Sequence, residues 1–387
     1  MRRFNYLVLG AGRQGTAIAY DLAVHGEAKR VVLADGIAPV AKNAAARVAA
    51  IAVGTPEVEG IACDVGEPAE VARLLPGFDV VVSAVPYRFN VALARAAVEA
   101  RCSFTDLGGN TAIVKQELAL DALARERGVA VVPDLGLAPG MGNVLAAWAL
   151  AELDLPREVH IRCGGLPQHP RGPLNYKLVF SVLGLSNEYA GMAMALRDGQ
   201  RVEIPTLTEP EELDVPGLGT LEAWVTSGGT STCPETFEGK LATYDYKTLR
   251  YPGHFGVFAA AKTLGLLDEE PIDVGGTKVV PRAMLHALIE RLCTYDDEDL
   301  VVLRVWASGK KGGKDATVTL QILDRQDAAT GFTAMERTTG FPTSIVAIMM
   351  ARGEIAPGAR PCELAVPGGA FLAGLEVRGL APRILWS

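Results

Sequence analysis

The 387-residue sequence lacks the features that mark a membrane protein or a nucleic-acid-binding protein. No run of apolar residues is long enough to cross a bilayer. Basic residues do not predominate, because 37 Lys and Arg stand against 45 Asp and Glu and the formal net charge is −8. A protein that binds nucleic acid needs a basic face to meet the phosphate backbone. We therefore expect an acidic globular protein whose partners include neither nucleic acid nor a membrane.

Paired cysteines are also lacking. The six cysteines are scattered singly, at positions 63, 102, 163, 233, 293 and 362, with no CxxC pair. This pattern fits reduced core thiols better than a disulfide framework or a zinc site, so we expect no metal. The amino-terminal MRRFNYLVLG has two basic residues, but its apolar run is too short for a signal peptide and no small-residue cleavage site follows. The expected location is the cytoplasm.

What the sequence does have is a glycine fingerprint near its start. An apolar strand expected at 6–9 runs into Gly10, Gly12 and Gly15 at GxGxxG spacing, and a helix is expected at 16–24. The three glycines make the tight turn, let the backbone approach a pyrophosphate, and let the helix pack closely on the strand. The helix N-terminus then offers unpaired N–H groups to the phosphates. The pattern predicts a dinucleotide site.

An acidic residue follows at the spacing that such a site requires. A second apolar strand, 31–34, ends at Asp35, which lies 20 residues beyond the last glycine. An acid here binds the adenosine ribose hydroxyls and would repel a 2′-phosphate. Residues 36–38 offer no compensating arginine, although Arg30 and Lys42 are near in sequence. An ordinary glycine-rich turn is disfavoured by this order of elements, and the pattern favours NAD over NADP.

The length of the chain and its alternating pattern indicate two domains. The first part alternates strands and helices, which is typical of a parallel, doubly wound Rossmann sheet in an α/β protein. We expect residues 1–145, completed by 340–387, to form the dinucleotide-binding domain. Residues 146–339 are expected to form an inserted α+β domain for substrate binding and oligomerisation. Further strands are expected at 58–63, 79–84, 103–107 and 129–132, six in all, and helices at 39–54, 68–75, 89–100 and 111–127.

The second half of the sequence has a different pattern, in which apolar and polar residues alternate with period two in several segments. Strands are expected at 158–163, 220–225, 300–307, 316–323 and 332–338, and the GKKGG run at 309–313 predicts a hairpin turn. A helix is expected at 281–293, with Leu285, Leu288, Ile289 and Leu292 on its apolar face and His286 on its surface. A final apolar helix is expected at 341–352.

Ligands bind at the carboxyl ends of strands in doubly wound sheets, so strand ends supply the candidate cofactor residues. Asp64 either touches the adenine or is a surface acid, and the small residues at 83–86 leave room for the pyrophosphate and the ribose. The cofactor site is expected to include Gly10, Gly12, Arg13, Gln14, Gly15, Asp35, Asp64, Ala84, Val85, Pro86 and Gly108.

Two stretches of the second domain, 164–191 and 244–256, place polar residues among prolines and apolar side chains. Arg250 is either an ion-pair partner between domains or a guanidinium clamp for an α-carboxylate. His254 follows four residues later, where a helix start disfavours its protonation. A neutral imidazole is what a proton acceptor needs, but a core or capping histidine fits equally well.

The remaining candidates each have a structural alternative. Lys177 and Glu188 form either an ion pair or part of a reactive site. A tyrosine such as Tyr176 most often packs its ring against apolar neighbours while its hydroxyl forms a hydrogen bond. Asp134 binds a substrate ammonium or caps the following turn.

Several motifs resemble those of the saccharopine dehydrogenase-like family. These are the glycine fingerprint, SAVP at 83–86, PDLGLAPGMGN at 133–143, GGLP followed by PLNYK and an EY pair, and KTLRYPGH at 247–254. The resemblance spans nearly the whole chain, and TLRYPGH is its most specific part. Within the family the chain looks most like the branch that oxidises the terminal amine of lysine.

The resemblance implies NAD-dependent oxidative deamination of the lysine ε-amine. The resulting imine is hydrolysed to the 6-semialdehyde, ammonia leaves, and the product cyclises to piperideine carboxylate. Arg250 would hold the α-carboxylate, and His254 or Lys177, oriented by Glu188 beside Tyr176, would activate water. Relatives acting on saccharopine or carboxynorspermidine remain the alternative, with Arg171 and Lys177 available for extra carboxylates. A non-catalytic NAD sensor is a third reading that leaves 250–254 without a purpose.

Overall fold

The computed structural model describes residues 3–52, 54 and 56–387, and the chain divides into two compact units. The first contains residues up to 148 together with 328–332 and 336–382. The second contains 149–327, 333–335 and 383–387. The second unit is thus inserted into the first, but the end of the chain differs from expectation. Residues 383–387 pair with the second sheet instead of completing the first domain.

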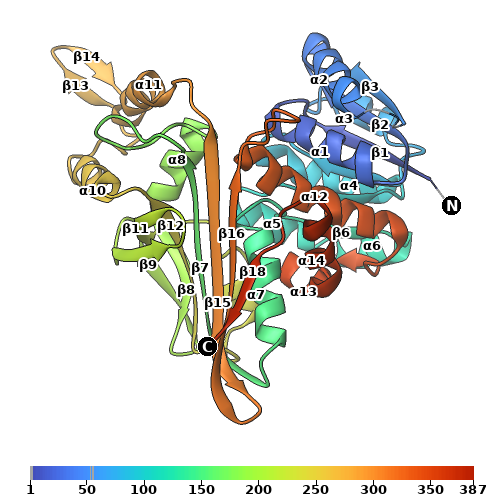
Figure 1. The fold of residues 1–387 in the computed structure, drawn as a ribbon. Helices are drawn as coiled ribbons and strands as arrows, with labels where there is room; N and C mark the ends of the chain where they lie inside the picture. Colours follow the sequence, from blue (N-terminus) through green and yellow to red (C-terminus); the bar gives the residue numbers. More distant parts are fainter. Residues whose placement is uncertain (1–2, 53, 55) are drawn as a thin grey trace. The chain divides into compact units, whose positions relative to one another are not determined.

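The first unit is built on a seven-stranded parallel sheet with the order β17-β6-β5-β4-β1-β2-β3. Figure 1 labels β1, β2, β3 and β6 of this sheet. Strand β1 lies between β4 and β2, where the strand order reverses, and this switch point is where ligands bind in such sheets. Strand β17 was not predicted, because a two-residue strand has no readable period. The strands are β1 Phe4–Leu9, β2 Ala28–Asp35, β3 Glu57–Ala62, β4 Val80–Ser83, β5 Ser103–Asp106, β6 Ala130–Val132 and β17 Gly358–Ala359.

The helices that follow these strands confirm the alternating pattern, with one correction. The long helix expected at 111–127 is two helices, α5 Thr111–Leu118 and α6 Asp121–Arg127. The break places Asp121 at the start of α6, where its Oδ1 accepts a hydrogen bond from the Ala359 N–H of β17 at 2.9 Å. The other helices of this unit are α1 Arg13–His25, α2 Ala38–Ile51, α3 Pro68–Leu74, the 3-10 turn η1 Tyr87–Phe89, α4 Asn90–Glu99, α13 Cys362–Ala365 and α14 Gly368–Val377.

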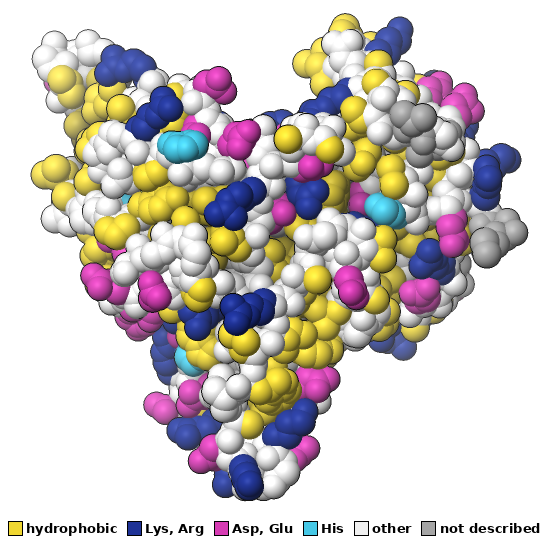
Figure 2. Space-filling model, viewed as in Figure 1, with side chains coloured by type: hydrophobic (Ala, Val, Ile, Leu, Met, Phe, Trp, Pro, Cys, Tyr) yellow, Lys and Arg dark blue, Asp and Glu magenta, His cyan; other side chains and the backbone are white. Residues whose placement is uncertain are grey.

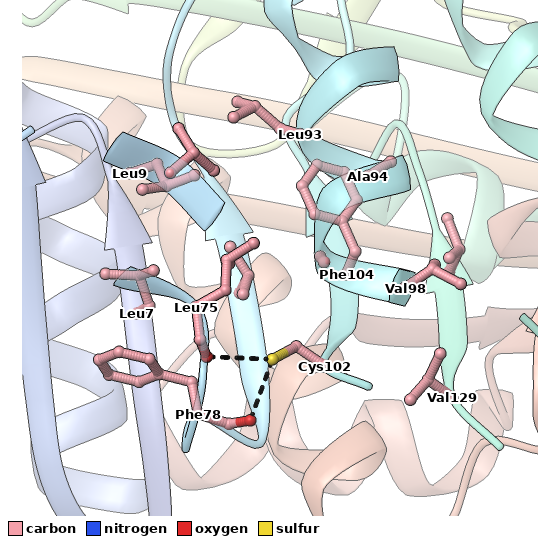
Figure 3. Packing of buried hydrophobic residues seen from close by; sticks show 14 of the residues in the cluster. Leu7, Leu9, Leu75, Phe78, Leu93, Ala94, Val98, Cys102, Phe104 and Val129 are labelled. Atoms are coloured by element: carbon pink, nitrogen blue, oxygen red, sulfur yellow. Dashed lines mark hydrogen bonds between the residues drawn. The ribbon is translucent and has the colours of Figure 1, made fainter. Parts of the chain in front are cut away.

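The core of the first unit is a cluster of buried hydrophobic residues between the sheet and its helices (Figure 3). Leu7, Leu9 and Phe104 from the strands meet residues from α4 and the loops, and full burial of each such side chain contributes about 1.5–3 kcal/mol. The Cys102 thiol donates to the carbonyl oxygens of Leu75 at 3.4 Å and Phe78 at 3.2 Å. All six cysteines of the chain are buried, and they form no disulfide.

The second unit is organised around a nine-stranded mixed sheet with the path β10-β11-β12-β7-β15-β16-β18, to which β8 and β9 are attached beside β12. Strands β12 and β7 are parallel, and the other neighbours are antiparallel. The predicted hairpin turn is confirmed between β15 and β16 (Figure 1). The strands are β7 Leu155–Pro167, β8 Met192–Arg197, β9 Gln200–Pro205, β10 Glu211–Val215, β11 Gly219–Val225, β12 Thr243–Arg250, β15 Asp299–Lys311, β16 Lys314–Arg325 and β18 Arg383–Trp386.

The strand expected at 332–338 is wrong, because helix α12 runs over Ala334–Arg352 and includes the helix predicted at 341–352. The Asp299 carboxylate of β15 accepts hydrogen bonds from the N–H groups of Ala334 at 2.7 Å and Met335 at 2.9 Å. This carboxylate satisfies the unpaired donors at the helix start. The residue that caps α12 is distant in sequence, so local alternation could not reveal it.

Helix α11, Pro281–Cys293, begins and ends where predicted, but its apolar face is only half buried. Ile289 is buried, whereas Leu288 and Leu292 are 43% and 49% exposed. The ribbon of β13 Ile272–Val274 and β14 Thr277–Val279 adds exposed apolar side chains at the same end of the unit (Figure 2). His286 is more than a surface residue, because its Nε2 is 2.8 Å from the Ser186 hydroxyl.

The remaining helices of the second unit are α8 Val182–Tyr189, α9 Cys233–Thr236 and α10 His254–Thr263, and α7 Met141–Ala151 leads from the first unit into the second. In the part of the chain that the structure describes, none of the helices combines the length and apolarity of a bilayer span.

Candidate active site

The three glycines of the loop in the first unit have different surroundings, as their predicted separate functions require. Gly10 has φ +92°, and a Cβ there would lie 2.6 Å from the Ala84 carbonyl oxygen of the neighbouring strand end. A Cβ on Gly15 would lie 1.8 Å from the Gly10 oxygen, so this position holds α1 against the strand. Gly12 has open space around its Cβ position. The loop is therefore a cradle with room for a pyrophosphate at Gly12, in front of the N-terminus of α1.

The next two residues of the fingerprint lie in the first turn of α1. The Arg13 guanidinium is ion-paired with Glu336 at 2.8 Å, and its side chain is 55% exposed. Gln14 follows it along the helix. To a bound phosphate this turn would offer its backbone N–H groups and the helix dipole, together with the positive charge of Arg13.

Asp35 ends β2 and is tied directly to the glycine loop. Its Oδ2 accepts a hydrogen bond from the Ala11 N–H at 2.9 Å, and its Oδ1 accepts one from the Ile37 N–H at 2.9 Å. Each carboxylate oxygen has a further lone pair for a ribose hydroxyl. The predicted acid therefore lies beside the predicted cradle, as a ribose-binding residue must.

The other strand ends contribute small or exposed residues. Ala84 approaches Gly10, Val85 packs against the core of the unit, and Pro86 is exposed where η1 begins. Asp64 is also exposed, and its Oδ1 accepts from the Gly66 N–H at 2.8 Å in a tight turn. Whether Asp64 meets an adenine stays a prediction.

A carboxyl pair that sequence reasoning missed holds the loop after β5. Asp106 Oδ1 accepts from the N–H groups of Gly108 at 2.6 Å and Asp134 at 3.2 Å, and Asp134 Oδ1 accepts from Gly109 at 3.4 Å. Asp106 and Glu117 are fully buried together. Burial, then repulsion by Asp106, raises the pKa of Glu117 to about 11, so Glu117 is protonated at neutral pH. No sequence pattern places β5 against this side chain of α5.

In the second unit, Arg250 is the last residue of β12 and is only 2% exposed. Its NH2 lies 3.5 Å from Glu188 Oε2, its NH1 donates to the Leu249 carbonyl at 2.9 Å, and its Cζ is 4.9 Å from the Tyr176 ring centre. Burial by itself would lower the pKa of Arg250, but Tyr189, Tyr176 and Glu188 keep it above its usual value. A permanent positive charge is thus held inside this unit.

Glu188, on helix α8, is the only acid ion-paired with Arg250 among the described residues. Its side chain is 29% exposed at one edge, whereas the oxygen toward Arg250 is buried. Burial raises the pKa of Glu188, Arg250 opposes that rise, and the result is about 7. Glu188 therefore changes charge near neutral pH.

His254, the first residue of α10, is completely buried. Its Nδ1 donates to the Leu174 carbonyl at 3.0 Å, and its Nε2 accepts from the Tyr189 hydroxyl at 3.0 Å. Burial, then Arg250, lowers the pKa of His254 to about 3. The expected neutral imidazole is present, with burial rather than the helix dipole as the main cause. Both of its nitrogens are already in hydrogen bonds.

Lys177 contacts a different set of residues from Arg250, Glu188 and His254. Its Nζ donates to the Asp297 carbonyl, and the Asp297 carboxylate binds the backbone and ring of His169 at 2.9 and 2.8 Å. Among the described contacts, none joins Lys177 to Glu188. The structure thus brings Arg250, Glu188, Tyr176 and His254 together and leaves Lys177 outside that set.

Two family descriptions match the chain, one for each part. The saccharopine dehydrogenase NADP binding domain matches residues 6–132, and the saccharopine dehydrogenase C-terminal domain matches residues 136–380.

Individual relatives are distant. The mitochondrial alpha-aminoadipic semialdehyde synthase of Mus musculus is 27% identical over 215 residues, which cover 53% of this chain and 23% of that protein. The chain thus spans about a quarter of the length of that relative. The carboxynorspermidine synthase of Vibrio cholerae is 24% identical over 305 residues, covering 72% of this chain and 71% of that protein.

A solved structure shares the fold. The apo saccharopine dehydrogenase (L-Glu forming) of Saccharomyces cerevisiae has a TM-score of 0.81 at 19% identity, covering 99% of this chain and 100% of the other. Together with the glycine cradle, the acid at the end of β2 and the two matched domains, this shows that the chain belongs to the saccharopine dehydrogenase family, whose members are oxidoreductases with a nicotinamide-cofactor-binding domain.

Proposed function

We propose that this protein is an NAD-dependent L-lysine 6-dehydrogenase. It would oxidise the terminal amine of L-lysine to the 6-semialdehyde, which cyclises to piperideine carboxylate, with release of ammonia. The observation that most supports this proposal is the buried Arg250, whose Nε has no hydrogen-bond partner in the described structure. A buried guanidinium with a free donor is a ready clamp for the α-carboxylate of an amino acid.

The residues of the first unit fit the cofactor that the family implies. The open space at Gly12 would hold the pyrophosphate, and Asp35 would hold the adenosine ribose. The cofactor, when bound, would supply the acceptor for the hydride that leaves the amine-bearing carbon. NAD is preferred in this proposal because the Asp35 carboxylate would repel the 2′-phosphate of NADP.

The reaction also requires a neutral amine, whereas a free lysine amine has a pKa of about 10.4. Apolar surroundings at the far end of the bound substrate would lower the pKa of its terminal ammonium. His254 and Lys177 are the candidates to activate water for imine hydrolysis. For His254 this requires that Tyr189 gives up its hydrogen bond to Nε2, because the imidazole has no other free nitrogen.

The first experiment is turnover. Purified protein is incubated with NAD and a panel of diamino acids while reduced-cofactor absorbance and free ammonia are followed. L-Lysine should give both signals, and a parallel assay with NADP should give a lower kcat/KM. Cofactor binding without turnover of any amine would favour the sensor alternative.

Arg250→Ala tests the proposed clamp. Loss of a charged contact to the carboxylate should lower kcat/KM for lysine by about a hundredfold, leaving NADH affinity unchanged. Arg201→Ala is the matched control, because Arg201 is 41% exposed and its ion pair with Glu238 lies at the surface. Equal loss of lysine and NADH binding in Arg250→Ala would mean that the residue is structural.

The relative from Vibrio cholerae, which aligns with 72% of this chain, favours a second candidate. In that case the substrate is a larger secondary amine, such as carboxynorspermidine or saccharopine. Such substrates have additional carboxylates, for which Arg171 and Lys177 are available. The product then contains a second amine instead of ammonia, so the ammonia assay separates the two functions.

The acidic composition and the unpaired spacing of the cysteines favour a cytoplasmic enzyme. We also expect a homodimer or larger homo-oligomer formed through the second unit. Light scattering coupled to size exclusion measures this directly.

A further inference from the structure

The group around Arg250 contains buried polar atoms without partners. Within the described structure, the Nε of Arg250 and the hydroxyl of Tyr176 are donors with no acceptor, and Oε2 of Glu188 accepts no hydrogen bond. Arg250 and Tyr176 are 2% and 1% exposed. Buried polar groups in native proteins are nearly always hydrogen-bonded, so a set of exceptions in one place indicates a missing ligand.

The chemistry of these atoms describes that ligand. Arg250 and Tyr176 need an acceptor, and Glu188 needs a donor. Arg250 and Glu188 carry opposite charges, and the distance from Arg250 NH2 to Glu188 Oε2 is 3.5 Å. An α-amino acid has a carboxylate and an ammonium on the same carbon, so it presents opposite charges at a similar separation.

We propose that Glu188 and Arg250 together bind the zwitterionic head group of an α-amino acid, with Glu188 on the ammonium and Arg250 on the carboxylate. The assignment rests on the proposed function for the identity of this group as the substrate site. Its new part is Glu188, which becomes a specificity-determining residue that separates amino acids from simple carboxylates. The reacting terminal amine would then lie at the other end of the bound molecule.

The charge of Glu188 makes this contact measurable. The pKa of Glu188 is about 7, because burial raises it and Arg250 holds it down. The ionised form is needed to attract an ammonium, so amino-acid affinity should rise as pH increases from 6 to 8.

The neighbouring ionisable groups do not titrate in this window. His254 has a pKa of about 3, Cys163 of β7 about 12, and burial raises the pKa of the three tyrosines above its usual value. Arg250 stays charged. The tyrosines are Tyr176 before α8, Tyr189 on α8 and Tyr246 on β12.

Two non-reactive probes separate the charges. L-Norleucine has the lysine backbone and head group without the terminal amine, and hexanoate has the carboxylate alone. In the proposed complex the norleucine ammonium lies against Glu188, and the carboxylate is farther away. The ammonium should therefore have the larger effect on the pKa of Glu188. Norleucine binding should lower this pKa and release protons near pH 7. Hexanoate neutralises Arg250, raises the pKa of Glu188 and takes protons up.

The experiment is calorimetric titration of the full-length protein with each probe at pH 7 in buffers of different ionisation enthalpy. Wild type should prefer norleucine over hexanoate by about tenfold or more, the effect of one charge-assisted contact, with opposite proton signs. Glu188→Gln should bind both probes with similar affinity and without proton exchange. Glu188→Asp keeps the charge and should retain part of the preference.

Glu212→Gln is the matched control, because Glu212 is an exposed carboxylate on β10 of the same unit and should behave as wild type. Proton uptake with norleucine, undiminished norleucine affinity in Glu188→Gln, or absence of norleucine binding to wild type would each overturn the assignment. Normal probe binding with no lysine turnover would instead refute the proposed reaction and leave the head-group site standing.

Discussion

At the scale of single residues, the glycine fingerprint shows how identical side chains have different functions. Gly15 is required because there is no room for a methyl group, since the Cβ would overlap the Gly10 oxygen at 1.8 Å. Gly12 has φ −71° and open surroundings, so the protein itself tolerates a side chain there. The absence of a side chain at Gly12 is what a ligand would require if its phosphates approach the backbone.

Alanine substitutions should therefore separate folding from cofactor binding. Gly12→Ala should keep the wild-type melting temperature and weaken NADH binding by about tenfold or more, because the added methyl group occupies the phosphate position. Gly15→Ala should lose about 3 kcal/mol of stability or more through backbone displacement. Circular dichroism melts and NADH fluorescence titrations measure both. A stable Gly12→Ala with undiminished NADH affinity would show that the pyrophosphate does not lie there.

At the scale of elements, helix α8 is positioned by a residue from α11. Arg282 is buried, and its NH2 donates to the Ser186 hydroxyl at 2.8 Å and to the Asn187 side chain. Its NH1 forms an ion pair with Glu269 at 2.6 Å. These contacts lie one turn or less from Glu188, so the geometry of the Glu188–Arg250 pair depends on Arg282.

Arg282→Lys tests this dependence, because an ammonium cannot reproduce the planar fork that reaches three partners. Amide exchange in α8 should become faster, and the norleucine preference over hexanoate should fall severalfold, with NADH binding unchanged. Arg291→Lys, at an exposed position of the same helix, is the control. If exchange in α8 is unaffected by Arg282→Lys, the helix is held by its apolar packing instead.

At the scale of the whole molecule, the chain passes between its two units more than once and ends in the second. Strand β18 pairs with β16, and Ser387 and Thr317 exchange backbone hydrogen bonds at 2.8 and 3.0 Å. Every residue of β18 is exposed, so this strand contributes little core. Its main role is to cover the edge of β16, which would otherwise present unpaired backbone groups.

Truncation after Pro382 should therefore affect the second unit alone. We expect faster amide exchange in β16 and concentration-dependent aggregation, because an uncovered edge strand recruits other strands. NADH affinity should match that of the full chain. Ile384→Thr, which retains the strand backbone, serves as the control. A parallel loss of NADH binding would show that β18 supports the first unit as well.

Predictions that depend on interactions between residues near in sequence were correct, whereas those that depend on contacts between distant residues failed. The turn at the glycine loop, the position of Asp35 at the end of β2 and the bounds of helix 281–293 were predicted correctly, because turn chemistry, spacing and periodicity act within a few residues. The start of α12 was mispredicted as a strand because Asp299, far away in sequence, caps it. The break between α5 and α6 likewise depends on the contact of Asp121 with β17.

The sequence by itself determined the family, the glycine turn after the first strand and the types of residue available for chemistry, since these depend on composition and local order. Only the tertiary structure decided which of them work together. It placed Glu188 of α8 against Arg250 of β12. It also engaged both ring nitrogens of His254 in hydrogen bonds and paired the Lys177 ammonium with the Asp297 carbonyl. The charge state of each group depends on burial and on charges within a few ångströms, and neither is defined until the chain has folded.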